Sequence, residues 1–485
     1  MTFPSFWRSS LVISAGLAAL LAVACSGSDV SNGDTNPDPT DPTPTDPVGD
    51  DLEGSDWTFD GDEATAKPSS DAPVGTGGST GYADAGADSG FAGSGGASGG
   101  AAGAAGGGTG GSGGTAGGTE AGGSGGDTGG TGGSTSIPAG QLTAGEWNDL
   151  ENWTFFEDLL VCPQSEPPTW CSAESTWQFE MNERFAVRVS NEGNPVRNAV
   201  VTLRDGQDAE LWEARTDVTG QAELFASMFG PQPGPYTIRV VTSAGTAETT
   251  LSASQGAELI ELDVDAPAPA ALSLDLMFVV DTTGSMSDEL SYIQAELEDV
   301  IERVHAGLSQ QLTVRLSTVF YRDEGDAYVV RSFPFTTDVP TAIAALRDQS
   351  ADGGGDTPEA VDRAMQVAID QQAWNENSAA KLMFLVLDAP PHQEDAAAMD
   401  RVRALTQRAA AKGIRIVPVS ASGIDKDTEF LLRFMDVATG GTYTFLTDDS
   451  GIGGSHLAAR PTIGDYEVEL LNDLMVRIVT ERLAW

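Results

Sequence analysis

The C-terminal half of the chain alternates between two kinds of hydrophobic pattern. Short, nearly continuous apolar runs are typical of strands covered on both faces, and they occur at 273–281, 312–321, 328–335, 381–388, 414–419 and 442–446. Longer stretches with apolar residues at helical spacing occur at 286–308, 341–348, 358–372, 396–411, 426–437 and 468–483. The alternation predicts an α/β domain over 271–485, with a doubly wound, mostly parallel sheet of six strands.

The region 177–265 has a different pattern, in which apolar and polar residues alternate. This pattern predicts short strands, separated by turn sequences such as Asp205-Gly206, at 185–189, 199–203, 222–225 and 236–241. Strands of this length and spacing predict a small β-sandwich. The stretches NEGNPVRNAVVTL, TDVTGQAELF and GPYTIRVV resemble carboxypeptidase-regulatory-like and bacterial immunoglobulin-like modules. The resemblance implies a spacer or binding module without catalysis.

The segment 25–138 contains almost nothing that could form a core. It begins rich in Pro and Asp and becomes nearly pure Gly, Ser, Ala and Thr. This composition predicts a disordered linker, and a Gly-rich coil of about 110 residues spans on the order of 60 Å. Ordinary composition returns in the connecting segment 139–176, whose Trp147, Trp153 and Phe155 predict a short helix that docks its rings on the next domain. An exposed ligand platform is the alternative.

The first 24 residues are typical of a secretion signal. Arg8 precedes an apolar stretch at 11–24 that is too short to span a bilayer. The sequence Leu21-Ala22-Val23-Ala24-Cys25 resembles the bacterial lipobox, and Ser26 after it resembles sorting to the outer membrane. The resemblance implies an exported lipoprotein of the bacterial outer membrane or cell surface, held by acyl chains on Cys25. An ordinary signal peptide is the alternative.

Two further cysteines, Cys162 and Cys171, lie close together in the connecting segment. In an exported protein such a pair favours a disulfide. A zinc or redox site is less favoured, because no His is near and the spacing is not Cys-x-x-Cys.

The charge of the chain limits its partners. With 72 Asp and Glu against 25 Lys and Arg, the net charge is -47. Nucleic acid is therefore excluded as a natural partner, because its phosphates would be repelled. The same charge favours divalent cations as counterions.

The most informative stretch is Asp281-Thr282-Thr283-Gly284-Ser285, between an apolar strand and a long helix. A strand that ends in a carboxylate and continues with two hydroxyls at alternate positions supplies the oxygen ligands that a hard cation requires. The stretch resembles the metal-ion-dependent adhesion site of von Willebrand factor type A domains, Asp-x-Ser/Thr-x-Ser. The resemblance implies that Thr283 and Ser285 bind Mg²⁺, or Ca²⁺ or Mn²⁺, directly. Asp281 would then hold metal-bound waters or the hydroxyls.

Two later segments complete the predicted site. The sequence from Gly353 to Ala360, GGGDTPEA, resembles the second metal loop of the family, where either Asp356 or Thr357 faces the ion and Asp356 is favoured. Asp388 ends a strand just as Asp281 does. In a doubly wound sheet these two strands flank the switch point, so their carboxylates should meet at one edge. If Asp356 approaches the ion, a third carboxylate should weaken the capture of acidic partners.

Asp288 and Glu289 follow closely and resemble an adjacent regulatory metal site of integrin β-subunits. The favoured alternative is that they are acidic residues in the first turn of a helix, stabilised by its dipole.

These observations predict an envelope-anchored lipoprotein that binds a protein or glycan partner through a divalent cation. One alternative is a structural or assembly scaffold in which the metal only braces loops. A metal-dependent hydrolase is disfavoured, because the sequence offers no nucleophile–base pair and no His/carboxylate metal triad. We therefore expect a protein that is not an enzyme.

Overall fold

The computed structural model describes residues 137–161, 169–181, 183–253, 258–267, 272–355, 357–452 and 460–483. All of these belong to one structural unit, Gly122–Trp485. Cys25, Cys162 and Asp356 lie outside the described residues, as does the side chain of Cys171, so the predicted lipidation and disulfide remain predictions. No helix in the described ranges is long and apolar enough to cross a bilayer.

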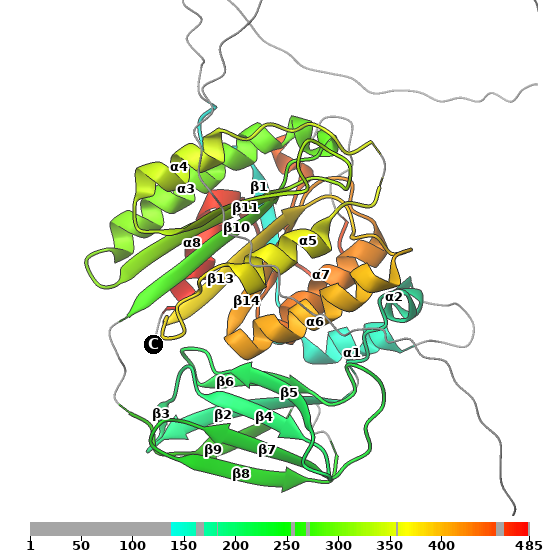
Figure 1. Ribbon diagram of the computed structural model, residues 1–485, viewed down its shortest axis with the longest axis vertical. Coiled ribbons are helices and arrows are strands. Elements are labelled where there is room, and N and C mark those ends of the chain that lie inside the picture. The colour runs from blue at the N-terminus through cyan, green and yellow to red at the C-terminus, as the bar shows by residue number, and fades with distance from the viewer. Residues whose placement is uncertain are drawn as a thin grey trace, which may run out of the picture. The chain divides into compact units, whose positions relative to one another are not determined.

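The α/β part is built on an eight-stranded mixed sheet in the order β12-β11-β10-β13-β14-β15-β1-β16 (Figure 1). Its strands are β1 (Thr143–Trp147), β10 (Ser273–Asp281), β11 (Thr313–Tyr321), β12 (Val330–Thr336), β13 (Ala380–Leu387), β14 (Ile414–Ser420), β15 (Tyr443–Leu446) and β16 (Val468–Leu470). The five strands from β11 to β15 in this order pair in parallel, while β12, β1 and β16 pair antiparallel. The α/β fold was predicted correctly, but the prediction of six mostly parallel strands was wrong.

The two strands that the sequence pattern missed extend one edge of the sheet. Strand β1 comes from the connecting segment 139–176, and it pairs with β15 about 300 residues later, Ala144 facing Leu446. No local pattern reports such a pairing. Strand β16 is only three residues long and immediately precedes a helix. A Cβ on Gly145 would stand 2.5 Å from the ring of Phe445, so glycine is needed for this close approach.

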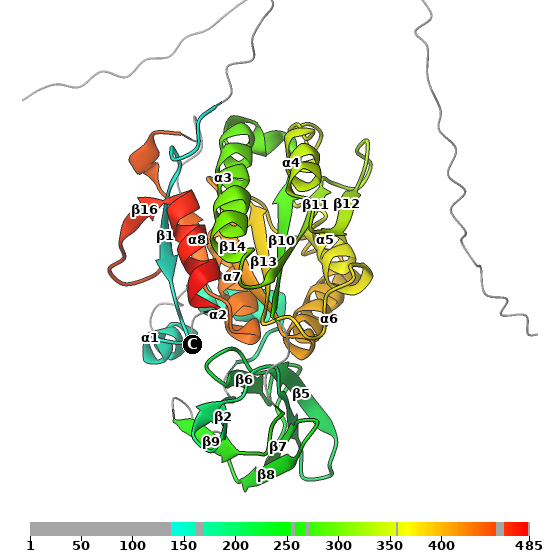
Figure 2. The same ribbon diagram turned by 90° about the vertical axis from the view of Figure 1, so that its left-hand side faces the viewer.

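Helices cover both faces of the sheet (Figure 2). They are α3 (Leu290–Leu308), α4 (Val339–Arg347) and α8 (Leu471–Glu481) on one face, and α5 (Val361–Gln366), α6 (Ala396–Lys412) and α7 (Lys426–Thr439) on the other. Successive residues of β10 alternate between the two cores: Leu276 and Phe278 pack with the first group, and Met277 and Val279 with the second. Three short turns of helix, η1 (Gly284–Asp288), η2 (Val367–Gln371) and η3 (Asp448–Ser450), complete this part.

A β-sandwich precedes the α/β part, as predicted. Its strands are β2 (Arg184–Asn191), β3 (Asn194–Pro195), β4 (Val200–Arg204), β5 (Glu210–Arg215), β6 (Gln221–Phe225), β7 (Tyr236–Val241), β8 (Thr246–Leu251) and β9 (Leu259–Asp263). One sheet has the order β3-β2-β6 with β9 paired to β2, and the other β5-β4-β7-β8. Aromatic pairs bridge the two sheets: the ring centres of Trp212 and Phe225 are 5.5 Å apart, and those of Phe185 and Tyr236 are 5.1 Å apart.

Two short helices, α1 (Trp153–Leu160) and α2 (Thr169–Trp177), follow β1. Their aromatic rings dock, but on α7 of the α/β part and not only on the sandwich, the next domain in the chain, as was predicted. Phe156 packs edge-on against Trp170, and Trp170 against Phe430 of α7. The indole N–H of Trp177 donates to the carbonyl of Asp427 at 2.7 Å. The segment that precedes the sandwich is therefore packed onto the α/β part.

Candidate metal centre

The ends of β10 and β13 bring two predicted site residues to the same edge of the sheet. The strands are parallel neighbours, with Val280 beside Val386. Asp281 is the last residue of β10, and Asp388 directly follows the end of β13. The predicted neighbourhood of these two strand ends is confirmed by this register, because the carboxyl ends of parallel neighbours lie together.

The turn after β10 lines up three of the predicted side chains. The Oδ1 atom of Asp281 accepts hydrogen bonds from the backbone N–H of Thr283 at 2.8 Å and from its hydroxyl at 2.7 Å. The Thr283 Oγ1 atom lies 3.1 Å from the Oγ atom of Ser285. Asp281 and Thr283 are buried, whereas Ser285 is exposed. The oxygens thus lead from a buried carboxylate out to the surface.

A residue that the sequence analysis did not name joins this group. Glu359 is buried, while Thr357 is exposed. A Cβ on Gly354 would stand 3.0 Å from the Oε1 atom of Glu359 and 3.3 Å from the Cβ atom of Thr283. The Glu359 carboxylate therefore reaches the turn after β10. The only feature of the sequence that could have indicated this role of Glu359 is its position just after the Gly-rich loop 353–355.

The carboxylates of this group strongly disfavour ionisation in the absence of a cation. Burial and then the negative charge of Asp388 raise the pKa of Asp281 to about 7. Burial and then the charge of Asp281 raise the pKa of Glu359 to about 9. The Tyr321 pKa is also raised, by burial and then by Asp281. The causes are desolvation and like-charge repulsion, both of which a bound cation would relieve.

Two carboxylate oxygens of the group are buried and accept no hydrogen bond of ordinary length in the described part of the chain, although the Tyr321 hydroxyl lies close enough to Asp281 to lower its pKa. They are the Oδ2 atom of Asp281 and the Oε2 atom of Glu359. A buried carboxylate oxygen left unpaired is costly, and Mg²⁺ and Ca²⁺ are bound by carboxylate and other oxygen ligands. The donor set of carboxylates and hydroxyls therefore fits a hard divalent cation. Among the described residues, however, no group of three or more His, Cys, Asp or Glu side chains is placed so that it could hold a metal ion. The hydroxyls of Thr283 and Ser285 are therefore needed as ligands.

Asp326 holds the Gly-rich loop beside the site. Its Oδ2 atom accepts from the backbone N–H of Gly354 at 2.8 Å and from that of Asp323 at 3.1 Å. Gly353 and Gly354 both have left-handed backbones, with φ of 77° and 65°. A Cβ on Gly353 would stand 2.4 Å from the Asp326 carboxylate, so a side chain there would displace the loop.

The two predicted residues of an adjacent metal site have different environments. Glu289 is buried and accepts hydrogen bonds from the hydroxyl and from the backbone N–H of Ser422, so it braces the loop after β14. Asp288 is only partly buried. Among the histidines, His392 lies between Asp323 and Glu394, each ring nitrogen 2.8 Å from a carboxylate oxygen.

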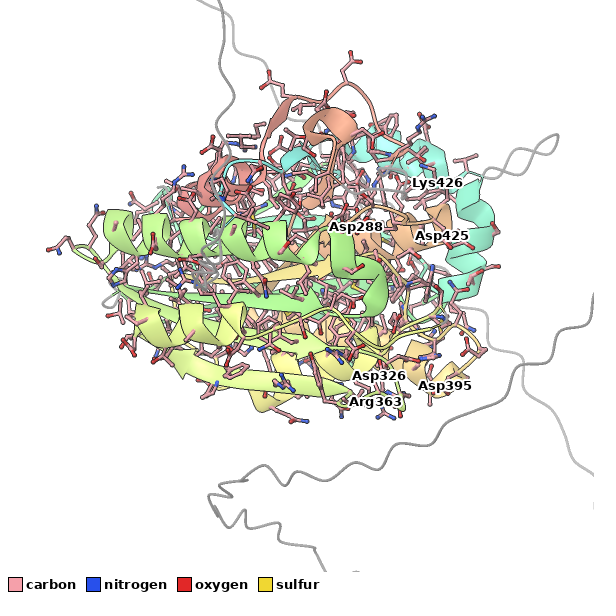
Figure 3. The ribbon with its side chains drawn as sticks, turned by 90° about the horizontal axis from the view of Figure 1, so that it is seen from above. Asp288, Asp326, Arg363, Asp395, Asp425 and Lys426 are labelled. Atoms are coloured by element: carbon pink, nitrogen blue, oxygen red, sulfur yellow. The ribbon has the colours of Figure 1, made fainter. Side chains whose placement is uncertain are left out.

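The surface around this edge is acidic. Figure 3 shows Asp288, Asp326, Asp395 and Asp425 at this end of the molecule, together with Arg363 and Lys426. The two basic side chains are already paired: Arg363 lies 3.2 Å from Glu324, and Lys426 lies 2.7 Å from Glu429. The described rim therefore offers little positive charge to an acidic partner.

Comparison with known families assigns the two parts of the chain separately. The von Willebrand factor type A domain family matches residues 275–453. A protein family of unknown function, DUF1416, matches residues 174–266 and thus covers the sandwich. The predicted resemblance of the sandwich to immunoglobulin-like modules is not supported by this match.

Similar proteins cover only parts of the chain. An uncharacterized protein of Mycolicibacterium smegmatis is 37% identical over 76 residues, 16% of this chain and 78% of that protein, so the two belong to one family. An ariadne-like RING finger protein, R811, of Acanthamoeba polyphaga mimivirus is 30% identical over 121 residues, 25% of this chain but only 11% of the viral protein. A solved von Willebrand factor type A structure from Catenulispora acidiphila aligns with a TM-score of 0.31 and 12% identity, covering 63% of this chain and 52% of that structure.

Proposed function

Because residues 275–453 form a von Willebrand factor type A domain, we propose that this chain is a binding protein that uses a divalent cation. Asp281, Thr283, Ser285 and Asp388 would hold the cation, Mg²⁺ or else Ca²⁺ or Mn²⁺. From the Gly-rich loop we add Glu359 as a ligand beside the predicted Thr357; Asp356 lies outside the described residues. The protein would act by binding rather than by catalysis.

The observation that carries this proposal is that one carboxylate oxygen of Asp281 and one of Glu359 are buried and accept no hydrogen bond of ordinary length from the described residues. A bound cation supplies the positive charge that the group lacks and an open coordination position for a partner's oxygen. The chain's own residues orient the ligands and leave one side of the site open. Asp281 orients Thr283 through two hydrogen bonds. Ser285 is exposed, which supports an opening of the site toward the surface on that side.

The partner would be a protein or glycan met at the cell surface. We propose that a lipid on Cys25 anchors the chain to the bacterial outer membrane, and that the Gly-rich linker holds the folded part away from it. The support is the lipobox resemblance and the composition of 25–138. The acidic rim further favours a partner that presents its metal-binding oxygen among basic or neutral groups.

One observation favours a second function, a scaffold in which the metal only braces loops. Asp281, Glu359 and Asp388 together carry more negative charge than a divalent cation neutralises. Such an ion attracts a further carboxylate weakly, and it would chiefly tie three loops together.

Capture of partners from cell envelopes separates these two functions. The full-length protein should retain a partner in the presence of Mg²⁺ and lose it in chelator, and Asp281→Ala should behave like the chelated protein. Asp449→Asn, which changes an exposed acid at the same edge, is the control and should retain the partner. Capture that persists with Asp281→Ala would refute a binding role for the metal and support the scaffold.

A further inference from the structure

A cavity of about 440 Å³, open to the surface, is lined by the start of α1 and by strands β2, β6 and β9 of the sandwich. This size lies within the roughly 300–1,000 Å³ of small-ligand sites. Its lining shares no residue with the candidate metal centre. The cavity therefore requires a separate explanation.

The floor of the cavity is formed by side chains that point away from the sandwich core. On β2 and β6, Arg184, Gln221 and Glu223 alternate with the core residues Phe185 and Leu224. The Nε atom of Arg184 donates to the Oε2 atom of Glu223 at 2.7 Å, and both side chains are more than nine-tenths buried. A guanidinium has five donors and a carboxylate about four acceptor positions, so this bond uses only part of their capacity.

The opposite wall is aromatic and comes from the start of α1. The guanidinium of Arg184 lies 4.3 Å from the ring centre of Trp153. The Trp153 indole N–H is buried and has no acceptor among the residues that the structure describes. Phe155 lines the same cavity with 36% of its surface exposed, and the Asn152 amide lies beside it.

This combination of groups identifies a class of ligand. The Arg184–Glu223 pair is neutral as a whole, so the floor does not attract an ion, and Glu151 at the rim disfavours anions. The Arg184 guanidinium and the side-chain amides of Asn152 and Gln221 can donate hydrogen bonds, and the Glu223 carboxylate and the same amides can accept them. Sugar hydroxyl groups both donate and accept, so they match this set. An exposed aromatic ring offers a flat apolar face for the C–H side of a sugar ring.

We propose that this cavity binds a neutral saccharide, with its hydroxyls on Arg184, Gln221 and Glu223 and a ring face on Phe155. This binding does not involve the cation, so it stands whether or not the metal centre is confirmed. The sandwich part would then be a carbohydrate-binding module beside a metal-dependent one.

Calorimetric titration of the full-length protein tests the proposal, with neutral trisaccharides of glucose, xylose, mannose and N-acetylglucosamine as probes. At least one should bind, equally well with and without chelator. Phe155→Ala and Gln221→Ala should each weaken that binding by roughly tenfold, the loss expected for one good contact. Phe229→Ala, an exposed aromatic that does not line the cavity, should leave it unchanged.

Three results would overturn the proposal. One is the absence of binding by every probe up to about 10 mM, which is weaker than any useful affinity. Another is binding that Phe155→Ala and Gln221→Ala leave intact. The third is tighter binding of uronic acid trisaccharides or of short basic peptides than of the neutral probes, because the charge argument would then be wrong.

Discussion

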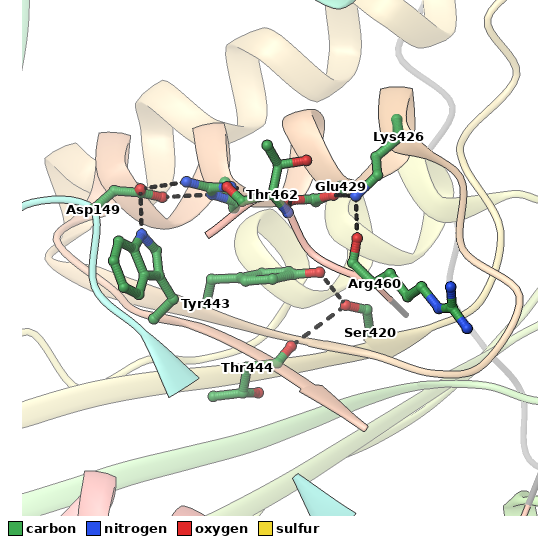
Figure 4. Close-up of polar contacts among 10 residues, drawn as sticks. Asp149, Ser420, Lys426, Glu429, Tyr443, Thr444, Arg460 and Thr462 are labelled. Carbon is green, nitrogen blue, oxygen red and sulfur yellow. Dashed lines mark hydrogen bonds and ion pairs between the residues drawn. The ribbon is translucent and has the colours of Figure 1, made fainter. Parts of the chain in front are cut away.

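The carboxylate of Asp149 forms a two-bond ion pair with the guanidinium of Arg433, 284 residues later in the chain, at 2.8 and 2.6 Å. Both side chains are buried. The same guanidinium donates to Glu429 and to the carbonyl of Thr462, both of which are labelled in Figure 4. It also lies 4.5 Å from the ring centre of Trp170. The pair therefore ties the segment after β1 to α7.

Removing Asp149 should destabilise the fold severely. Asp149→Ala leaves the buried Arg433 charge without its main partner, a change that typically costs about 3–5 kcal/mol. The measurement is urea unfolding followed by tryptophan fluorescence. Glu151→Ala, an exposed acid two residues away, is the control and should change stability by less than about 0.5 kcal/mol. Similar unfolding midpoints for the two variants would contradict this description of the network.

A second buried carboxylate holds the start of β1. Glu296 of α3 accepts from the backbone N–H groups of Gly140, Gln141 and Leu142, at 2.7, 2.7 and 3.0 Å. Glu296→Gln loses the charge and one of the two acceptor oxygens, so we expect a loss of about 1.5–3 kcal/mol.

Limited proteolysis near Gly140 measures the same effect locally. Cleavage there should be faster in Glu296→Gln than in the parent protein. The control is Glu298→Gln, which changes a neighbouring acid that is paired with Arg347. Cleavage of this variant near Gly140 should be no faster than in the parent protein. Equal cleavage rates in all three proteins would show that Glu296 does not hold the strand.

Gly354 should be needed for the metal centre itself and not only for its loop. Its φ is 65°, and a Cβ there meets the Oε1 atom of Glu359 at 3.0 Å. Gly451 has nearly the same φ, 67°, but a Cβ there meets nothing within 4 Å. Alanine at either position should cost about 1 kcal/mol of stability. Only Gly354→Ala should also weaken cation binding; an equal effect of both variants on affinity would contradict the placement of Glu359.

The pH dependence of stability should change sign with the cation. Without it, the pKa values of Asp281 and Glu359 are raised to about 7 and 9, above their values of 3.8 and 4.5 in the unfolded chain. The folded state then binds more protons between about pH 4 and 9, so this contribution to stability is full below pH 4 and is lost as the pH rises.

Thermal melts from pH 5 to 9 measure this effect. In chelator, the contribution of these two groups should fall with rising pH, and Glu359→Gln should flatten the upper part of the curve. With saturating cation, the ionised carboxylates are the binding form, so the stabilisation should grow with pH. A cation effect that is the same at pH 5 and pH 9 would contradict the assignment of these ligands.

The neighbouring positions of β10 and β13 were predictable from the sequence, because each strand has a clear apolar pattern of its own. The apolar runs that end in Asp281 and Asp388 placed both residues correctly, because parallel neighbours share their carboxyl edge. The role of Glu359 was not predictable, since burial of its side chain depends on how the loop around Gly354 folds back. The full number of strands was missed because β1 becomes a strand only through its distant partner β15.

Cation titration of the full-length protein by calorimetry tests the central claim most directly. After chelator treatment, the parent protein should bind a single Mg²⁺, Ca²⁺ or Mn²⁺ ion. Glu359→Gln should weaken that binding by at least about tenfold, as expected when a charged ligand is lost, whereas Asp449→Asn should match the parent. If no ion binds the parent protein, or if Glu359→Gln binds it as tightly, then the buried oxygens of Asp281 and Glu359 do not form a metal centre.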